Sequence, residues 1–394
     1  MLPFPPIANP AIPRLTDLAL TAVVESFNSY PNFDRIPKKF RNKVLQTLDI
    51  DTPLTTAVIS IPDGLFWKRL VLTRFSDLAY DPKRKTWKSF YIEHYAAKRI
   101  EEASVEELDQ LFEELTVLGP FIRELVIKRL PSKISMLRLF RTFRGLKSLS
   151  LVYGEPRRSF EYYSEFETYD LTADHDVTLA DCQNFASDFE QLGTNCRLQR
   201  FSMSDNSLKD RSFIRIAKGL VRLNTLTHLC FSHNEIGNSG AFAIASCMAT
   251  SPIESLDLTD NKIGHDAAEN ICNLAMHCPT LKTLLLGSNN IGTKGVLFFG
   301  QLIKKSTSIE KIDLSGNRIT SFRDLISFVP EAKSLKELIV YANPLDENER
   351  KELREATDAN KIISEVDMRT YELKDEDFTI KTTETSEAPL LRFK

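Results

Sequence analysis

Three side chains in the middle of this sequence could carry chemistry together. His228 and Cys230 stand two residues apart, and Asp257 follows 27 residues after the cysteine. An imidazole, a thiol and a carboxylate on one face could hold a metal ion or activate a thiol nucleophile. One histidine and one cysteine on a single expected strand give either role little support. We therefore expect no catalytic, cofactor-binding or metal-binding residue.

A second group, Cys272, His277 and Cys278, is like a metal cluster in composition only. Its spacing fits no common zinc site, and Cys272 belongs to an amphipathic helical pattern, so burial as small hydrophobic residues explains it better. No Cys-x-x-Cys pair or secretory signal is present, which predicts reduced thiols in a cytoplasmic compartment. P-loop, G-x-S-x-G, H-E-x-x-H and paired-carboxylate motifs are also missing, so the sequence predicts that the protein is not an enzyme.

An internal repeat supplies the elements that position these side chains. Six segments match L-x-x-L-x-L-x-x-N-x-I/L, beginning at Leu198, Leu226, Ile253, Leu281, Ile309 and Leu335. Their asparagines, spaced 26 to 28 residues apart, are Asn206, Asn234, Asn261, Asn289, Asn317 and Asn343. We interpret the asparagines as a structural ladder, because their amides can bond backbone groups where the chain leaves each strand.

Each repeat combines a short strand with a helical pattern. Side chains alternate along a strand, so the leucine-type residues at positions 4 and 6 face a core that neighbouring repeats complete. Ile236-Gly237 and its equivalents open a turn, after which apolar periodicity predicts a helix. A strand and a helix in about 28 residues resemble the ribonuclease-inhibitor subtype of leucine-rich repeats. We predict an α/β fold: a leucine-rich-repeat solenoid of ribonuclease-inhibitor type with an N-terminal helical domain.

At 394 residues the chain should form more than one domain. Apolar spacing without an asparagine at 122–127 and 146–151 indicates two divergent repeats. Asp346 and Glu349 have the spacing of a capping box, which predicts a C-terminal helix. The expected divisions are an extended Pro-rich arm at 1–13, a helical domain at 14–118, divergent repeats at 119–195 with an acidic, aromatic insertion at 155–176, regular repeats at 196–345, a C-terminal cap at 346–369 and a mobile tail at 370–394.

Strand positions 3, 5 and 7 alternate with the buried positions and should form the concave surface, where repeat proteins usually bind. We predict a protein-binding face there that includes Arg200, His228, Asp257, Leu285, Lys311, Asp313, Glu337, Ile339 and Tyr341. Six strands would make it roughly 24 Å wide, which suits a protein rather than a small ligand. The insertion offers five further protein-binding side chains, namely Phe160, Tyr162, Tyr163, Phe166 and Tyr169. A disordered loop is the alternative interpretation of the insertion.

Charge and hydropathy limit the partners. The formal charge is −3 and the pI is about 6.2, so we expect no binding to nucleic acid or to an anionic membrane. No apolar run is long enough to span a bilayer. Two basic segments occur in the N-terminal domain, at 35–43 and 83–88. We interpret them as solvated faces, with contact to acidic tubulin surfaces as the alternative.

Three N-terminal segments carry a family resemblance when they precede repeats of this type: TDLALTAVVESFNSYP, GLFWKRLVLTRF and TWKSFYIEHYAAKRIEE. They resemble the T-complex-associated testis-expressed family of ciliary leucine-rich-repeat proteins, which provides subunit 5 of the nexin–dynein regulatory complex. The resemblance covers about 14–360, and the two Trp-centred segments carry most of its weight. It implies a stationary, non-catalytic subunit of the cytoskeleton in a cilium or flagellum, tethering axonemal doublets and relaying control to dynein. The implied partners are other axonemal proteins: regulatory-complex subunits, with tubulin or dynein components as further candidates.

Two other classes of protein share this layout. F-box-type substrate receptors of ubiquitin ligases also place helices ahead of leucine-rich repeats, and IPKKFRNKVLQTLDI followed by WKRL is similar to that arrangement. The usual Leu-Pro opening is replaced here by Ile36-Pro37. GTPase-activating proteins for Ran use ribonuclease-inhibitor-type repeats, but their long acidic C-terminal run is missing, since 371–394 is mixed in charge. Both classes remain alternatives to an axonemal subunit.

Overall fold

Within the residues that the structure describes, nine parallel strands form one continuous sheet, and they follow chain order from one edge to the other. They are β1 (Glu124–Leu130), β2 (Ser148–Tyr153), β3 (Arg200–Ser202), β4 (His228–Cys230), β5 (Ser255–Asp257), β6 (Thr283–Leu285), β7 (Lys311–Asp313), β8 (Glu337–Ile339) and β9 (Glu365–Asp367). The pairing keeps the repeats in register, so that His228 lies beside Ser255 and Ser255 beside Thr283. Equivalent positions of successive repeats therefore stand in rows across the sheet. The predicted leucine-rich-repeat solenoid is confirmed.

The computed structural model describes residues 14–81, 83, 85–130, 134–153 and 177–368. The described residues divide into two compact units, of which the first ends at Tyr95 and the second begins at Ala96. All nine strands belong to the second unit. Helix α6 (Leu108–Leu115) also belongs to it, although this helix lies within the expected helical domain 14–118.

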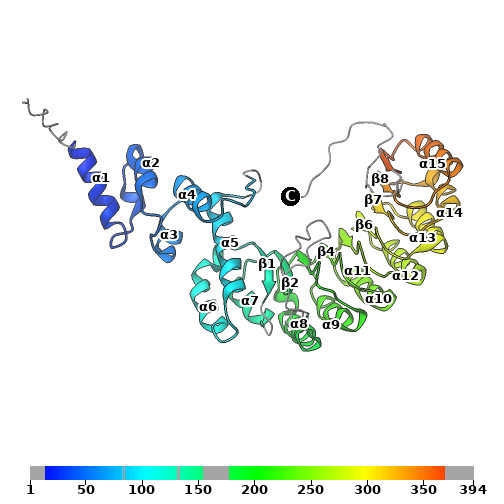
Figure 1. Cartoon of the computed structure of the whole chain (residues 1–394), viewed down its shortest axis with the longest axis horizontal. Coiled ribbons are helices and arrows are strands. Elements are labelled where there is room, and N and C mark those ends of the chain that lie inside the picture. Colours follow the sequence, from blue (N-terminus) through cyan, green and yellow to red (C-terminus); the bar gives the residue numbers. More distant parts are fainter. Residues whose placement is uncertain (1–13, 82, 84, 131–133, 154–176, 369–394) are drawn as a thin grey trace, which may run out of the picture. The chain divides into compact units, whose positions relative to one another are not determined.

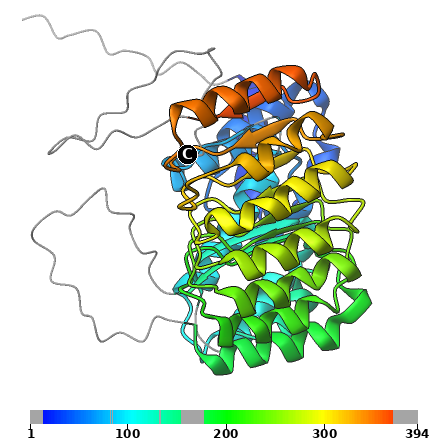
Figure 2. The same ribbon diagram turned by 90° about the vertical axis from the view of Figure 1, so that its right-hand side faces the viewer.

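Helices connect successive strands and cover the outer side of the sheet (Figure 1). They are α7 (Met136–Thr142), α8 (Leu179–Leu192), α9 (Asp210–Leu220), α10 (Asn238–Ala245), α11 (Cys247–Thr250), α12 (His265–Ala275), α13 (Gly292–Lys305), α14 (Arg323–Ile326) and α15 (Glu347–Ala359). Three 3-10 turns complete the second unit, η2 (Thr116–Phe121), η3 (Gly193–Asn195) and η4 (Val329–Glu331). Figure 2 shows the longer helices stacked beside one another in chain order. In the part of the chain that the structure describes, no helix has both the length and the apolar character needed to cross a bilayer.

The core of the second unit lies between the sheet and the helices. Strand positions 4 and 6 are buried in all six regular repeats, as Leu256 and Leu258 illustrate. Between the first regular repeats the ring of Phe231 meets Phe201 and Phe213 edge to face, with centroids 6.0 and 4.7 Å apart. Because each repeat supplies only part of this core, every repeat is stabilised by its neighbours.

The first unit is helical, and Trp67 lies at its centre. Its elements are α1 (Leu15–Ser26), η1 (Phe33–Arg35), α2 (Lys38–Thr47), α3 (Leu54–Ser60), α4 (Leu65–Arg74) and the first part of α5 (Trp87–Glu102). Trp67 is fully buried, and its ring meets Phe66 edge to face at 5.4 Å. Trp87 is half-buried instead and stacks on Tyr80 with centroids 3.5 Å apart. Trp67 therefore belongs to the core of the unit, whereas Trp87 lies at its margin.

The second basic segment contributes to packing within the first unit. Lys88 Nζ donates to the carbonyl oxygens of Val58 at 2.6 Å and Ile61 at 3.0 Å. Burial lowers the pKa of Lys88, as expected for an ammonium group drawn out of water. Lys85 Nζ lies 2.8 Å from a carboxylate oxygen of the buried Glu93. These two lysines bind inside the unit, so interpreting this segment as a solvated face is wrong for both.

The last strand, β9, is one that the sequence interpretation missed. It pairs with β8 through Val366 beside Leu338, inside the expected cap 346–369. Ile363, Val366 and Met368 repeat the apolar spacing of the other strands without an asparagine behind them. That spacing could have identified the strand, but its side chains are only half-buried, so the apolar signal is short and isolated.

One long repeat fills the interval between the divergent and the regular strands. Strand β2 pairs directly with β3, Leu149 lying beside Phe201. Of the intervening chain the structure describes 177–199, which holds helix α8. Thr178 and Asp181 form a complete capping box at the N-terminus of this helix. The insertion 155–176 and its five aromatic residues lie outside the described residues, as do the arm 1–13 and the tail 370–394.

Helix α15 is joined to the preceding repeat by one buried carboxylate. Asp346 accepts a hydrogen bond from the N–H of Glu349 at 2.7 Å, as the capping-box spacing predicts. Glu349 does not complete the box. Its carboxylate, 3% exposed, accepts from Ser321 Oγ at 2.5 Å and from the N–H of Phe322 at 3.0 Å. The side chain thus satisfies the backbone just before α14, one repeat away.

Replacing Glu349 should therefore destabilise the C-terminal end of the solenoid. Glu349→Ala leaves the buried N–H of Phe322 without its acceptor, which should lower the free energy of unfolding by about 1–3 kcal/mol. Chemical denaturation of the full chain measures the change. Glu352→Ala, at an exposed site on the same helix, is the matched control and should change stability by less than about 0.5 kcal/mol. Equal stability of the two variants would contradict the proposed link.

Candidate protein-binding face

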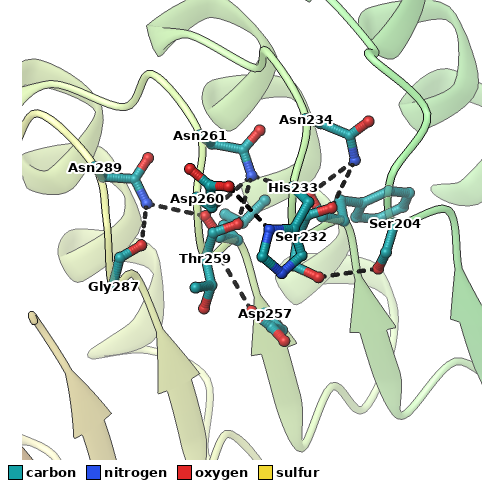
Figure 3. Close-up of polar contacts among 12 residues, drawn as sticks. Ser204, Ser232, His233, Asn234, Asp257, Thr259, Asp260, Asn261, Gly287 and Asn289 are labelled. Atoms are coloured by element: carbon teal, nitrogen blue, oxygen red, sulfur yellow. Dashed lines mark hydrogen bonds and ion pairs between the residues drawn. The ribbon is translucent and has the colours of Figure 1, made fainter. Parts of the chain in front are cut away.

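The six repeated asparagines are buried and hydrogen-bonded where the chain leaves each strand. Figure 3 shows three of them, Asn234, Asn261 and Asn289. Nδ2 of Asn261 donates to the carbonyl oxygen of Phe231 in the preceding repeat at 2.9 Å and to that of Leu258 at 3.1 Å. Its Oδ1 accepts from the N–H of Ile236 at 3.0 Å. The other five asparagines likewise donate to a carbonyl and accept from an N–H of the repeat before them. Each short amide satisfies groups that would otherwise be buried unpaired.

The residue before each ladder asparagine adopts a left-handed backbone conformation. Its φ is 60° at Asp205, 55° at His233, 53° at Asp260, 54° at Ser288 and 60° at Gly316, and Ala342 follows the same pattern. Only one of these residues is glycine, so the others accept a conformation that costs an L-residue roughly 1–2 kcal/mol. The turn directs the N–H of His233 to the carbonyl oxygen of Thr259 in the next repeat, at 2.9 Å. The sheet bonding therefore continues past the end of each short strand.

The structure places the expected concave residues together on the inner side of the sheet, with unequal exposure. Arg200 and His228 are exposed, whereas the other seven are half-buried. At position 7 some residues are buried rather than accessible, since Ser232 and Ser315 are only 8% and 3% exposed. The expectation that position 7 is open surface is wrong for these repeats, since the chain already turns toward the asparagine ladder there. Positions 3 and 5 remain the accessible columns.

Four charged side chains of this face, those of Asp257, Lys311, Asp313 and Glu337, are engaged with one another or with the backbone. Nζ of Lys311 lies 2.6 Å from Oε1 of Glu337. Asp257 and Asp313 each accept a hydrogen bond from the N–H two residues later, at 3.0 and 2.8 Å. Burial raises the pKa of Asp313 above its ordinary range, and the nearby Asp257 adds to this effect. Each aspartate therefore accepts a backbone hydrogen bond just after its own strand and also faces the concave side.

The group His228, Cys230 and Asp257 comes together only in part. Cys230 Sγ lies 3.4 Å from Asp257 Oδ2 and 3.2 Å from Ser204 Oγ. Burial and the Asp257 carboxylate raise the pKa of the Cys230 thiol. The imidazole Nδ1 of His228 bonds the hydroxyl of Thr227 at 2.9 Å, and burial lowers its pKa. The carboxylate beside the sulfur opposes formation of a thiolate, and the lowered pKa of His228 disfavours the protonated imidazole that would promote it. This is the reverse of nucleophile activation.

The second cysteine group is structural. Cys272 and Cys278 are buried free thiols, and burial raises the pKa of Cys272 well above its ordinary value. His277 bonds the carbonyl oxygen of Asn273 at 2.8 Å, one helical turn earlier. Among the residues that the structure describes, no group of three or more His, Cys, Asp or Glu side chains is arranged to hold a metal ion.

Strand β9 extends the concave columns by one repeat that the sequence interpretation did not include. Glu365 stands beside Glu337 in the column of position 3, and Asp367 stands beside Ile339 in the column of position 5. Both residues are acidic, which makes the C-terminal part of the face more negative than the sequence interpretation indicated. The apolar spacing at 363–368 was the signal that could have placed them.

The fold and this face define a leucine-rich-repeat protein of ribonuclease-inhibitor type. A family model described as "Leucine Rich repeat" matches residues 222–245, 251–272 and 277–300. Ribonuclease inhibitor of Sus scrofa is 27% identical over 165 residues, covering 40% of this chain and 36% of that protein. Such repeats occur in proteins of several functions, so they establish the fold class and not the function.

Two relatives support the resemblance to the ciliary family. Dynein regulatory complex subunit 5 of Chlamydomonas reinhardtii is 25% identical over 202 residues, covering 50% of this chain and 49% of that protein. Dynein regulatory complex subunit 5 of Mus musculus is 22% identical over 266 residues, covering 59% of this chain and 51% of that protein. The match spans about half the length of each relative. The chain is therefore similar to dynein regulatory complex subunit 5.

Removing one asparagine from the middle of the ladder should destabilise the second unit. Asn261→Ala leaves the buried N–H of Ile236 without its acceptor and removes one of the two amide donors to the carbonyl of Phe231, the other being Asn234. The expected cost is about 1–3 kcal/mol in free energy of unfolding. Urea denaturation of the full chain measures it. Asn290→Ala, at an exposed site in the following repeat, is the matched control. An unchanged midpoint for Asn261→Ala would show that the ladder does not stabilise the fold.

The Cys230 thiol should react slowly near neutral pH. Its raised pKa keeps the sulfur protonated, so alkylation by iodoacetamide should accelerate only as the solution becomes strongly alkaline. Asp257→Asn removes a carboxylate that raises this pKa and should speed labelling about two- to threefold at mildly alkaline pH. Mass spectrometry of the Cys230 peptide gives the rate, with the fully buried Cys272 as the unreactive control. Rapid labelling of the native protein at neutral pH would indicate an activated thiol.

Proposed function

We propose that this chain is a non-catalytic structural subunit of a dynein regulatory complex in the axoneme of a cilium or flagellum. There it would help to link neighbouring doublets and to regulate dynein-driven motility. The observation that carries the proposal is the similarity to dynein regulatory complex subunit 5 from an alga and from mouse. The mouse match covers 59% of the chain, which is more than the regular repeats at 196–345 can supply. The likeness therefore extends beyond the regular repeats.

The structure supports a binding role for the second unit. Parallel strands give a broad inner surface whose accessible columns carry both charged and aliphatic side chains. Surfaces of this kind suit contact with another protein, since they offer area and mixed polarity without a deep cavity. We include Arg200, His228, Asp257, Leu285, Lys311, Asp313, Glu337, Ile339 and Tyr341 in the proposed protein-binding face.

A non-catalytic role is supported by the chemistry of the face. Its thiol, Cys230, lies beside a carboxylate that raises its pKa, and its histidine has a lowered pKa. Both shifts weaken the pair as a nucleophile and base, because an active pair needs a thiolate beside a protonated imidazole. The asparagine ladder holds the backbone below the face in one register, which suits a stationary part of an assembly.

The proposal predicts that the protein is retained in the axoneme. A tagged full chain expressed in ciliated cells should stay with axonemes after the membrane is removed with detergent. High salt should then release it together with other subunits of the dynein regulatory complex, because charged interfaces weaken as ionic strength rises. Quantitative immunoblotting of the detergent, salt and residual fractions measures this. Recovery only in the detergent-soluble fraction, or capture of the cullin adaptor by the tagged chain, would contradict the proposal and favour the ubiquitin-ligase alternative.

A further inference from the structure

Acidic and aliphatic side chains alternate along strand position 5 in the C-terminal half of the solenoid. From β5 to β9 the register places in one row Asp257, Leu285, Asp313, Ile339 and Asp367. All five are half-buried, so each presents part of its side chain on the inner side of the sheet. The alternation begins at β5, because the preceding strands carry Ser202 and Cys230 at this position. We call these five residues the acid–aliphatic row.

The surroundings of the row are acidic as well. Column 3 of the same five strands reads Ser255, Thr283, Lys311, Glu337 and Glu365. Its ammonium group, on Lys311, is bound to the carboxylate of Glu337 at 2.6 Å. Among the described residues, these two columns thus hold five carboxylates and one ammonium group. Such a surface repels nucleic acid and anionic membranes and attracts basic protein segments.

The middle acid of the row packs against the backbone of the neighbouring repeat, where a glycine allows the close approach. A Cβ at Gly287 would lie 3.1 Å from Asp313 Oδ2 and 2.7 Å from Ser315 Oγ. A side chain at this point would crowd the carboxylate, so the glycine is what lets Asp313 be partly buried here. Burial raises the pKa of Asp313, so holding its charge destabilises the unbound protein. A cation from a partner would offset that cost.

The spacing of the row distinguishes a helix from an extended chain. Neighbouring strands lie about 4.8 Å apart, so successive acids of the row are about 9.6 Å apart. In an extended peptide, side chains on one face recur at roughly 6.8 and 13.6 Å, and neither value matches. In an α-helix, residues seven apart share a face and are about 10.5 Å apart, while residues three or four apart are at about 4.5–6 Å. The acids thus match every seventh residue of a helix, and the aliphatic residues match positions between them.

We infer that the acid–aliphatic row docks one basic amphipathic α-helix of a partner protein, lying across strands β5 to β9. Lysine or arginine at every seventh position meets Asp257, Asp313 and Asp367, and apolar residues between them cover Leu285 and Ile339. This inference rests on the proposed function in taking the inner side of the sheet as the binding face. It adds the chemistry, the secondary structure and the residue spacing of the segment that occupies this part of the face.

A set of designed helical peptides tests the spacing directly on the unmodified full chain. The first is a fluorescent peptide of about 21 residues with lysine at every seventh position, leucine midway between lysines, and alanine and glutamine elsewhere. The second has the same composition with its lysines moved to the opposite face, and the third has glutamate in place of lysine. Fluorescence anisotropy should give saturable binding of the first peptide, with the other two at least about tenfold weaker. Absence of saturable binding, or equal affinity for the first two peptides, overturns the inference.

Variants of the protein then test the row itself. Asp257→Asn and Asp313→Asn keep the oxygen that accepts the backbone N–H, and each should weaken the first peptide about three- to tenfold. Because burial raises the pKa of Asp313, Asp313→Asn should melt at the same temperature as the parent protein or higher. The matched control is the pair Glu352→Gln and Asp358→Asn, at exposed sites of α15, which should leave affinity unchanged. Equal losses in the control and in the row variants would reduce the effect to net charge and overturn the inference.

The peptide measurements test the docking surface and the axoneme fractionation tests the proposed function, so either idea can be overturned without the other. If the parent chain is retained in axonemes but the first peptide binds no better than its rearranged form, the inference is wrong and the proposed function stands. If the first peptide binds through the row but the chain is not retained in axonemes, the proposed function is wrong and the docking surface stands. The purified full chain serves for all binding assays, so neither outcome depends on isolating part of the molecule.

Discussion

The solenoid depends on one requirement: polar backbone groups must be satisfied where the chain leaves each strand and turns into the core. The strands are three residues long in the regular repeats, so their ladders end almost at once. Asparagine solves this by donating to a carbonyl and accepting from an N–H of the repeat before it, as Asn261 does with Phe231 and Ile236. The left-handed residue ahead of it, the alignment of the columns and the open inner surface all follow from that arrangement.

Much of this fold can be read from the sequence, because the asparagine and the apolar positions recur at a fixed spacing. Helix α8 and the two divergent strands were also predictable from periodicity and capping residues. Strand β9 was not recognised, because Val366 is only half-buried and no ladder asparagine follows it. Alternation also placed position 7 on the surface, whereas the turn toward the ladder buries Ser232 and Ser315. Spacing predicts which side a residue faces but not where the chain bends.

The character of the inner face depends on contacts between repeats, and these are the hardest to predict. The pairing of Lys311 with Glu337 joins residues 26 apart, and the Cys230 thiol meets Asp257 from the next repeat. Considered one repeat at a time, such residues indicate a surface of mixed charge. Once the register is known, opposite charges at position 3 are paired while the acids at position 5 form a line with aliphatic residues between them. The polarity of the face therefore depends on which residues of successive repeats stand side by side, not on the composition of any single repeat.

The parallel stacking of the second unit also determines how it would carry load. Its strands run across the direction in which the repeats succeed one another, so the hydrogen bonds between strands point along that direction. Tension applied between the two ends of the stack is borne by each junction in series, and every junction stretches slightly. The unit would therefore extend gradually under load, and the junction with the fewest cross-links would separate first. The junction of β1 with β2 is the longest, with five paired positions. The junction of β8 with β9 pairs at three positions, and β9 has no ladder asparagine of its own, so unravelling under strain would begin there.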